Sequence, residues 1–206
     1  YRNQYGLLMA KATREGLKYE MPDTRHFILS RAGFAGMQRY AANWTGDCIS
    51  DWHHLAMSVY MNCNLGLSGQ PFVGGDVGGF ARDTEAELLV RWYQYGVFQP
   101  FFRNHAGKGS REQYPWSFDK PSKDRIRQAV KLRYQLLPYI YTAFEEAART
   151  GYPVQRPLVF DYQDDPAVRE NSTEFLFGPS LLVAPVVEKG ARKRNLYLPK
   201  GNWYCF

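Results

Sequence analysis

Residues 71–80 read PFVGGDVGGF, an apolar segment that runs into paired glycines on either side of one aspartate. The apolar part has the length and composition of a buried strand, and glycine permits the tight turns and close backbone approach that follow. Comparable apolar runs lie near residues 26–30, 40–45 and 97–102. Helix-like and strand-like segments alternate along this part of the chain, which predicts a parallel sheet rather than a sandwich.

Two helices are expected to accompany these strands. Apolar or small residues recur at helical spacing over 52–63, with Ser50 as the predicted N-cap and Gly66 as the predicted stop. The segment TEAE (84–87) has the capping-box pattern and predicts a second helix. One face of that helix is expected to be apolar, formed by Leu88, Leu89, Trp92 and Tyr93.

A long helix is expected over 122–149, kinked at Pro138 and stopped by Gly151. The pattern changes after this glycine, because short β-rich segments with turn residues between them replace the helical spacing. We therefore expect residues 1–151 to form an α/β domain and residues 152–206 to begin an all-β domain of the β-sandwich type.

The strand–helix units of the first part amount to about half of a (β/α)8 TIM barrel. An open half-barrel exposes apolar edges, so the chain is either a fragment of a barrel or a doubly wound sheet. A polar side chain follows each strand candidate: Arg31, Asp47, Asp76 and His105. Since the carboxyl ends of barrel strands meet at one active-site mouth, this placement favours the second half of a TIM barrel.

Each of these polar residues also has a structural explanation. Asp47 could cap the helix after it, although Ser50 and Asp51 are better placed to do so. Asp76 is equally suited to an Asx turn between glycines, and His105 has no HxxxH partner that would suggest a metal. A guanidinium at Arg31, if it is buried after its strand, requires a carboxylate partner or a polar ligand.

The composition limits the classes of function. Aromatic residues are abundant, with 15 Tyr, 13 Phe and 5 Trp, and their rings stack on sugars and nucleobases as well as filling cores. The formal net charge is +6, but the basic residues are spread along the chain except for KGARKR (189–194), so no nucleic-acid partner is expected. The 3 cysteines show neither zinc-site spacing nor a disulfide framework, and no apolar stretch has the length of a membrane helix.

Carboxylates, an arginine, a histidine and the rings of Trp44 and Phe80 at one mouth are typical of carbohydrate chemistry. The chain resembles glycoside hydrolase family 31, the α-glucosidase family, along essentially its whole length. The segments that resemble the family are NQYGLLMAKATREGL (3–17), FILSRAGFAGMQRYAANWTGD (27–47), PFVGGDVGGF (71–80), ELLVRWYQYGVFQPFFRNHA (87–106), LRYQLLPYIYTAFEEAARTGYPVQRPL (132–158) and FLFGPSLLVAPV (175–186).

This resemblance implies a retaining, exo-acting α-glucosidase that removes terminal α-linked glucose from oligosaccharides without a metal or other cofactor. Asp47, in WTGD, matches the general acid/base of the family. The residues that match positions lining the sugar subsite are Arg31, Trp44, Asp76, Phe80, Arg103 and His105. By analogy, Asp76 and His105 are expected to hold sugar hydroxyls while the aromatic rings shape the pocket.

Two departures from the family pattern affect these expectations. The family's nucleophile is an aspartate in a WxDMNE-like motif on an earlier strand, and no such motif occurs here. The chain is therefore expected to be a fragment that needs the remainder of its own polypeptide and that is inactive and poorly folded alone. Cys48 follows the acid where many α-glucosidases have asparagine, so an α-xylosidase or transglycosylase of the same family remains an alternative, as does a non-catalytic sugar-binding relative.

Overall fold

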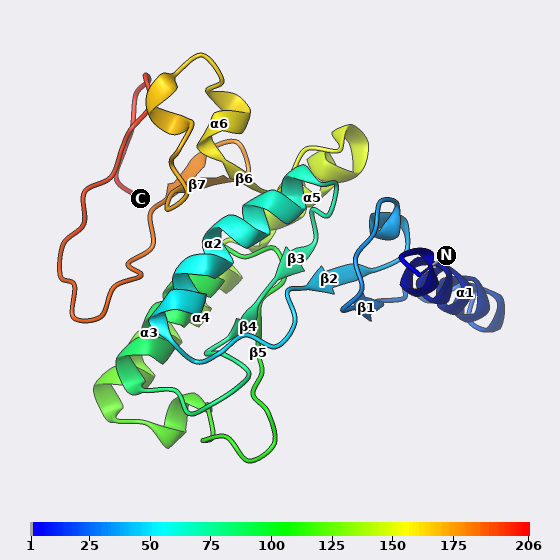
Figure 1. Cartoon of the computed structure of the whole chain (residues 1–206), viewed down its shortest axis with the longest axis horizontal. Coiled ribbons are helices and arrows are strands. Elements are labelled where there is room, and N and C mark those ends of the chain that lie inside the picture. The colour runs from blue at the N-terminus through cyan, green and yellow to red at the C-terminus, as the bar shows by residue number, and fades with distance from the viewer. Residues whose placement is uncertain (1) are drawn as a thin grey trace.

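The computed structural model describes residues 2–206, which form short parallel strands flanked by helices, with a small antiparallel sheet at one end (Figure 1). The parallel strands are β1 (Leu29–Ser30), β2 (Ala42–Trp44), β3 (Val73–Gly74), β4 (Asp76–Val77) and β5 (Arg103–Asn104). β1, β2 and β3 pair in that order, and β4 pairs with β5. Only Gly75 separates β3 from β4, so the first sheet leads directly into the second. The neighbouring strands therefore follow the order of the chain.

The predicted alternation of strands and helices is confirmed, but the apolar run 97–102 is not a strand. The N–H groups of residues 97–99 donate to carbonyls three or four residues earlier, which continues helix α3 (Ala86–Gly96) as turns. The run is apolar because its side chains are largely buried in these turns. Phe101 N already donates to Val73 O of β3 at 3.0 Å, and strand β5 itself begins at Arg103, which is in register with Asp76 of β4.

A buried arginine holds the turn that precedes β5. Arg133 donates hydrogen bonds to the carbonyls of Val97 and Gln99 at 2.6 Å each and to the carbonyl of Pro100 at 2.9 Å. Burial lowers the pKa of Arg133 to about 10, so the guanidinium stays protonated at neutral pH. This cation fixes the turn and, with it, the position at which β5 begins.

Helix α2 (Trp52–Leu67) begins at Asp51 rather than at the predicted Ser50. The Asp51 carboxylate accepts a hydrogen bond from His54 N at 2.7 Å, and it lies 2.9 Å from His54 Nδ1. Burial opposes ionisation of this carboxyl, but the hydrogen bonds and the charge of the histidine prevail and hold the pKa of Asp51 below its usual value. Asp51 is therefore the N-cap, because it supplies the acceptor that the first turn needs.

Replacing Asp51 with alanine is expected to destabilise the protein by about 1 kcal/mol, because the first turn of α2 loses its side-chain acceptor. The measurement is thermal unfolding of the full-length protein at neutral pH. Ser50→Ala is the matched control, since Ser50 Oγ donates to Arg82 O at 3.2 Å and not to the helix. A larger loss of stability in the serine variant would contradict the assignment of the cap to Asp51.

Two other predicted helix signals act differently in the structure. Gly66 lies inside α2 instead of ending it, and a Cβ there would come within 2.8 Å of Gln155 O, so the glycine permits close approach of the C-terminal part. Thr84 does not cap α3; the N-cap is Glu85, whose carboxylate accepts a hydrogen bond from Trp52 Nε1 at 3.1 Å. The predicted apolar face of α3 is confirmed by the burial of Leu88, Leu89, Trp92 and Tyr93.

The predicted long helix is divided into α4 (Lys120–Gln135) and α5 (Leu137–Thr150), which meet at Leu136. Pro138 occupies the first turn of α5, where its missing N–H costs no helical hydrogen bond. The proline therefore separates two helices instead of kinking one. Gly151 has a φ of 80°, the left-handed conformation that ends helices, as predicted.

The antiparallel sheet consists of β6 (Gln155–Pro157), β7 (Phe175–Phe177) and β8 (Leu181–Val183). The connection from β6 to β7 also contains helix α6 (Leu158–Asp161) and a 3₁₀ turn at Pro166–Val168, which the β-rich pattern did not indicate. Pro166 is the first residue of the 3₁₀ turn, a position that its fixed φ suits, and Pro157 is the N-cap of α6.

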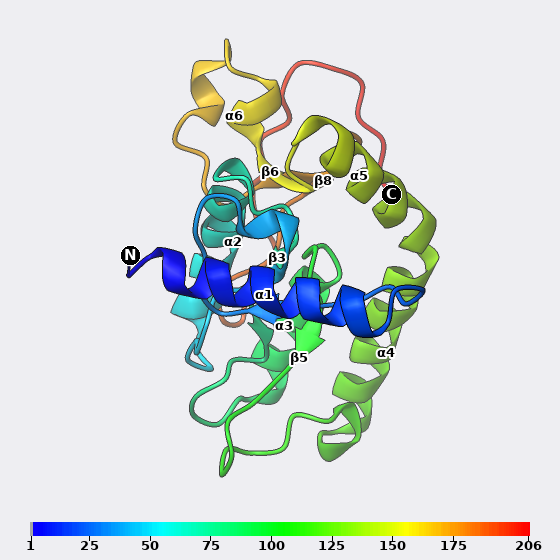
Figure 2. The same cartoon turned by 90° about the vertical axis from the view of Figure 1, so that its right-hand side faces the viewer.

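One hydrophobic core joins the helices to the antiparallel sheet, and its most buried side chains include Leu55, Trp92, Phe175 and Phe177. Helix α1 (Gln4–Glu20) lies apart from this core and packs on the turn at residues 37–41; Figure 2 shows it crossing one side of the molecule. The parallel strands do not close into a barrel within residues 2–206. No helix in that range is long and apolar enough to cross a membrane.

Candidate active site

Most of the predicted site residues lie at or beyond the carboxyl ends of the parallel strands. Arg31 directly follows β1, Asp47 lies just beyond β2, and His105 directly follows β5. Asp76 was expected just after its strand but is the first residue of β4, where it is in register with Arg103, the first residue of β5. Because all these strands are parallel, their carboxyl ends lie along the same edge.

The structure brings Arg31 and Asp47 together, with Arg31 Nη1 3.5 Å from Asp47 Oδ2. The carboxylate partner expected for Arg31 is therefore present. Neither side chain is buried within residues 2–206, since 62% of the Arg31 side chain and 45% of the Asp47 side chain are exposed. Gly46 has a φ of 83°, and a Cβ there would lie 3.1 Å from Arg31 Nε, so the glycine of WTGD makes room for the arginine.

Asp76 is fully buried, and its Oδ1 accepts a hydrogen bond from Arg103 Nη2. Burial raises the pKa of Asp76, while the hydrogen bond and the charge of Arg103 act in the opposite direction. Within residues 2–206, Asp76 Oδ2 and Arg103 Nε are buried and have no hydrogen-bond partner. An unpaired buried polar atom costs roughly 1–3 kcal/mol, so a ligand hydroxyl or a water molecule is expected at this pair.

Aromatic rings surround the Asp76–Arg103 pair. Arg103 Cζ lies 5.3 Å from the centroid of the Trp44 ring, which is a cation–π distance. Phe80 and His105 stack with their ring centroids 5.3 Å apart. Trp44 Nε1 is a further buried polar atom that has no partner in the described part of the chain. The edge therefore combines apolar ring faces with unpaired donors and acceptors, as sugar-binding sites do.

Backbone hydrogen bonds join the loop of Asp47 to the loop of Phe80. Cys48 O accepts from Phe80 N at 2.8 Å and from Ala81 N at 2.9 Å. The Cys48 thiol is buried and donates to Asp76 O at 3.5 Å. Burial raises the pKa of Cys48 to about 11, so the thiol is neutral. The residue after the proposed acid thus connects the two loops, a role that its position in the sequence did not reveal.

Sequence reasoning also missed two amide side chains that hold this region. Asn104 Nδ2 donates to Val77 O at 2.6 Å and to Gln113 Oε1 at 2.9 Å. Gln113 Nε2 donates in turn to Gly79 O at 2.8 Å. Asn104 stands inside the FRNH segment, which is the signal that could have found it, whereas nothing in the sequence around Gln113 distinguishes it from an exposed loop residue.

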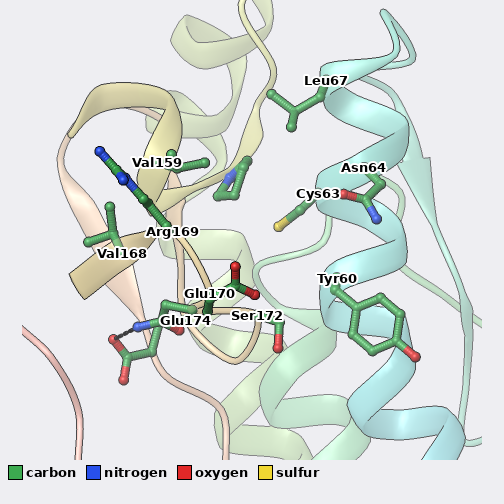
Figure 3. A pocket seen from close by; sticks show the side chains of 12 residues that line it. Tyr60, Cys63, Asn64, Leu67, Val159, Val168, Arg169, Glu170, Ser172 and Glu174 are labelled. Carbon is green, nitrogen blue, oxygen red and sulfur yellow. Dashed lines mark hydrogen bonds between the residues drawn. The ribbon is translucent and has the colours of Figure 1, made fainter. Parts of the chain in front are cut away.

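A pocket of about 420 Å³ lies elsewhere, between α2 and the segment 157–174 (Figure 3). Its lining includes Tyr60, Cys63, Leu67, Glu170 and Glu174. None of the predicted site residues lines it, so this pocket is separate from the strand-end site. Across residues 2–206, no group of 3 or more His, Cys, Asp or Glu side chains is arranged to hold a metal ion.

Parallel strands separated by helices, with charged and aromatic side chains at the strand ends, are the arrangement of a β/α-barrel enzyme domain. The chain belongs to glycosyl hydrolase family 31: the model of that family's TIM-barrel domain matches residues 1–143, and the model of its C-terminal domain matches residues 151–206. The predicted fold class is confirmed as the second half of a TIM barrel followed by the start of a C-terminal β domain, and the doubly wound alternative is excluded.

Curated relatives of the chain are α-glucosidases. The chain is 51% identical over 201 residues to Alpha-glucosidase 2 of Bacillus thermoamyloliquefaciens. This match covers 98% of this chain and 26% of that protein. It is 46% identical over 205 residues to Neutral alpha-glucosidase AB of Homo sapiens. This match covers 98% of this chain and 22% of that protein. The chain therefore spans about a quarter of the length of these relatives.

Solved structures share the fold closely. A family 31 dextranase of Flavobacterium johnsoniae, complexed with glucose, matches with a TM-score of 0.93 at 37% identity, over 97% of this chain and 26% of that one. The family 31 α-glucosidase from Bacteroides thetaiotaomicron matches with a TM-score of 0.91 at 47% identity, over 98% of this chain and 33% of that one. The open row of strands is thus the arrangement that the corresponding segment has inside larger proteins.

Proposed function

We propose that the protein containing this chain is a retaining, exo-acting α-glucosidase that releases terminal α-linked glucose from oligosaccharides. The observation that supports this most directly is the half-exposed Asp47 carboxylate beside Arg31, on the strand-end edge that also holds the Asp76–Arg103 pair. Curated relatives that cover nearly the whole chain are α-glucosidases, and one structural relative holds glucose. These likenesses support glucose as the sugar at the site.

Asp47 is proposed to act first as a general acid and then as a general base. In the first step, a carboxylate from outside these residues attacks the anomeric carbon, and Asp47 gives its proton to the departing glycosidic oxygen. In the second step, Asp47 takes a proton from water, whose oxygen displaces the enzyme carboxylate and releases glucose in the α configuration. Arg31, whose Nη1 is 3.5 Å from the carboxylate, orients Asp47.

The sugar is proposed to lie against Trp44 and Phe80, with its hydroxyls toward Arg103 and His105. The Arg103 side chain is 29% exposed, whereas the Asp76 side chain beneath it is fully buried. We therefore propose that Asp76 acts on the sugar mainly by holding Arg103. This differs from the direct contact that the resemblance implied for Asp76.

The domain boundary is proposed to lie near residue 151. Gly151 ends α5, and the two family models match on either side of it, over residues 1–143 and 151–206. The nucleophile and the other barrel strands are proposed to come from the remainder of the polypeptide. The isolated chain is accordingly expected to be inactive.

The experiment that tests the proposed function is hydrolysis by the full-length protein of maltose and of the nitrophenyl derivatives of α-glucose, β-glucose and α-xylose. We expect turnover of both α-glucosides and not of the β-glucoside, with α-glucose as the first sugar that proton NMR detects from nitrophenyl α-glucoside. Maltotriose labelled at its reducing end is expected to release unlabelled glucose first, because an exo-acting enzyme removes the opposite terminal residue.

Other outcomes identify the alternatives. Initial release of β-glucose from nitrophenyl α-glucoside would contradict the retaining mechanism. A preference for the xyloside would indicate an α-xylosidase, and longer oligosaccharides formed from maltose would indicate a transglycosylase. Binding of glucose without any turnover would indicate a non-catalytic sugar-binding relative.

A further inference from the structure

We propose that Gln113 and Asn104 form an amide clamp that positions Phe80 and Asp47 for the sugar. This proposal rests on the proposed function and adds to it two positioning residues that do not touch the reacting atoms. Gln113 is 4% exposed although it lies in the connection between β5 and α4. A buried amide in a surface connection requires a reason, because it must find partners for both its donors and its acceptor.

Two amides bind three successive carbonyls of one loop. Gln113 Nε2 donates to Gly79 O at 2.8 Å and to Gly78 O at 3.3 Å, and Asn104 Nδ2 donates to Val77 O at 2.6 Å. The two side chains are linked directly, since Asn104 Nδ2 also donates to Gln113 Oε1 at 2.9 Å. The clamp therefore fixes the backbone of residues 77–79 from two separate chain segments.

The clamped backbone is one that would otherwise be free to move. Gly78 and Gly79 have φ values of 97° and 86°, in the region that favours glycine. A Cβ on Gly78 would overlap Gln113 Oε1, and a Cβ on Gly79 would overlap the backbone of Ser50. The two glycines thus lie in close contact with the Gln113 amide on one side and with the loop that follows Asp47 on the other. Glycine has the largest backbone entropy to lose, so its conformation depends on such external contacts.

The clamp acts on both sides of the sugar site. On one side, Phe80 N donates to Cys48 O at 2.8 Å, so the clamped loop supports the residue next to Asp47. On the other side, the Phe80 ring stacks on His105, which follows the clamp residue Asn104 in β5. Loss of the clamp is therefore expected to loosen the aromatic wall and the general acid together.

The experiment compares wild type, Gln113→Met and Gln128→Met in the full-length protein. Methionine matches glutamine in length and removes its hydrogen bonds, and Gln128 is an exposed residue of α4 that serves as the control. We expect the affinity for glucose, measured by titration calorimetry, to fall about tenfold in Gln113→Met and to stay unchanged in Gln128→Met. The value of kcat/KM for nitrophenyl α-glucoside is expected to fall by at least the same factor.

A second variant separates hydrogen bonding from filling of space. Asn104→Leu keeps the shape of the side chain but removes the donor to Val77 O and Gln113 Oε1, so the clamp predicts weaker glucose binding, whereas a space-filling role predicts wild-type binding. This variant also provides the test if Gln113→Met does not fold. The double variant Gln113→Met with Asn104→Leu is expected to bind glucose no more weakly than the weaker single variant, since both side chains hold the same loop.

Unchanged glucose affinity in folded Gln113→Met and Asn104→Leu would overturn the clamp, as would fully additive losses in the double variant. Failure of the proposed function gives a different result, because wild type itself would then neither bind glucose nor hydrolyse α-glucosides. In that case amide hydrogen exchange still tests the clamp. Exchange at Phe80 and Ala81, whose N–H groups donate to Cys48 O, is expected to be faster in Gln113→Met, and unchanged exchange would overturn the proposal.

Discussion

Replacing Asp47 with alanine in the full-length protein is expected to lower kcat/KM for maltose by about 10²- to 10⁴-fold, the usual contribution of general acid–base catalysis. The sugar leaving group of maltose must be protonated as it departs, and Asp47 is the accessible carboxylate at the strand-end edge. Nitrophenolate is a stable anion that leaves with little protonation. Formation of the glycosyl–enzyme from nitrophenyl α-glucoside is therefore expected to be partly spared.

Added azide distinguishes a general base from a residue that only supports the fold. Azide attacks the glycosyl–enzyme without losing a proton, so it is expected to restore turnover of nitrophenyl α-glucoside by Asp47→Ala, with glucosyl azide as the product. Asp164→Ala, at an exposed turn of the C-terminal part, is the matched control and is expected to keep full activity. Equal losses on both substrates with no response to azide would contradict the role of Asp47.

Replacing Arg103 with methionine is expected to destabilise the protein by about 3–5 kcal/mol, because the fully buried Asp76 carboxylate loses its ion-pair partner. The double variant Arg103→Met with Asp76→Asn is the control, since it removes both charges. It is expected to recover much of the lost stability. Thermal or denaturant unfolding of the full-length protein measures both effects.

The loss in Arg103→Met is also expected to depend on pH. Burial raises the pKa of Asp76 and Arg103 opposes the rise, so its removal raises the pKa further. A carboxyl with a raised pKa in the folded state binds more protons there than in the unfolded state, so stability falls as pH rises. The deficit is expected to be small near pH 4 and to grow toward about pH 7. A deficit that is constant over this range, or one that the double variant shares in full, would contradict the buried ion pair.

Local patterns predicted most of the architecture because they report local physics. The apolar face of α3, the end of α5 at Gly151 and the parallel order of the strands follow from side-chain periodicity and from the conformational freedom of glycine. The prediction failed at residues 97–102, where burial in a turn and burial in a strand produce the same apolar run. It also did not choose Asp51 over Ser50 as the N-cap, because adjacent serine and aspartate residues both suit that position.

The candidate site also has features that the sequence predicted and features that it did not. The sequence was enough to select Arg31, Asp47, Asp76 and His105 and to predict that they gather at one edge, because the order of the strands and the residues that follow them are local properties. Only the tertiary structure decided that Arg31 is exposed, that Asp76 is buried and that Gln113 binds the glycine loop. Burial and hydrogen-bond partners depend on contacts between segments far apart in the chain, and no local pattern contains that information.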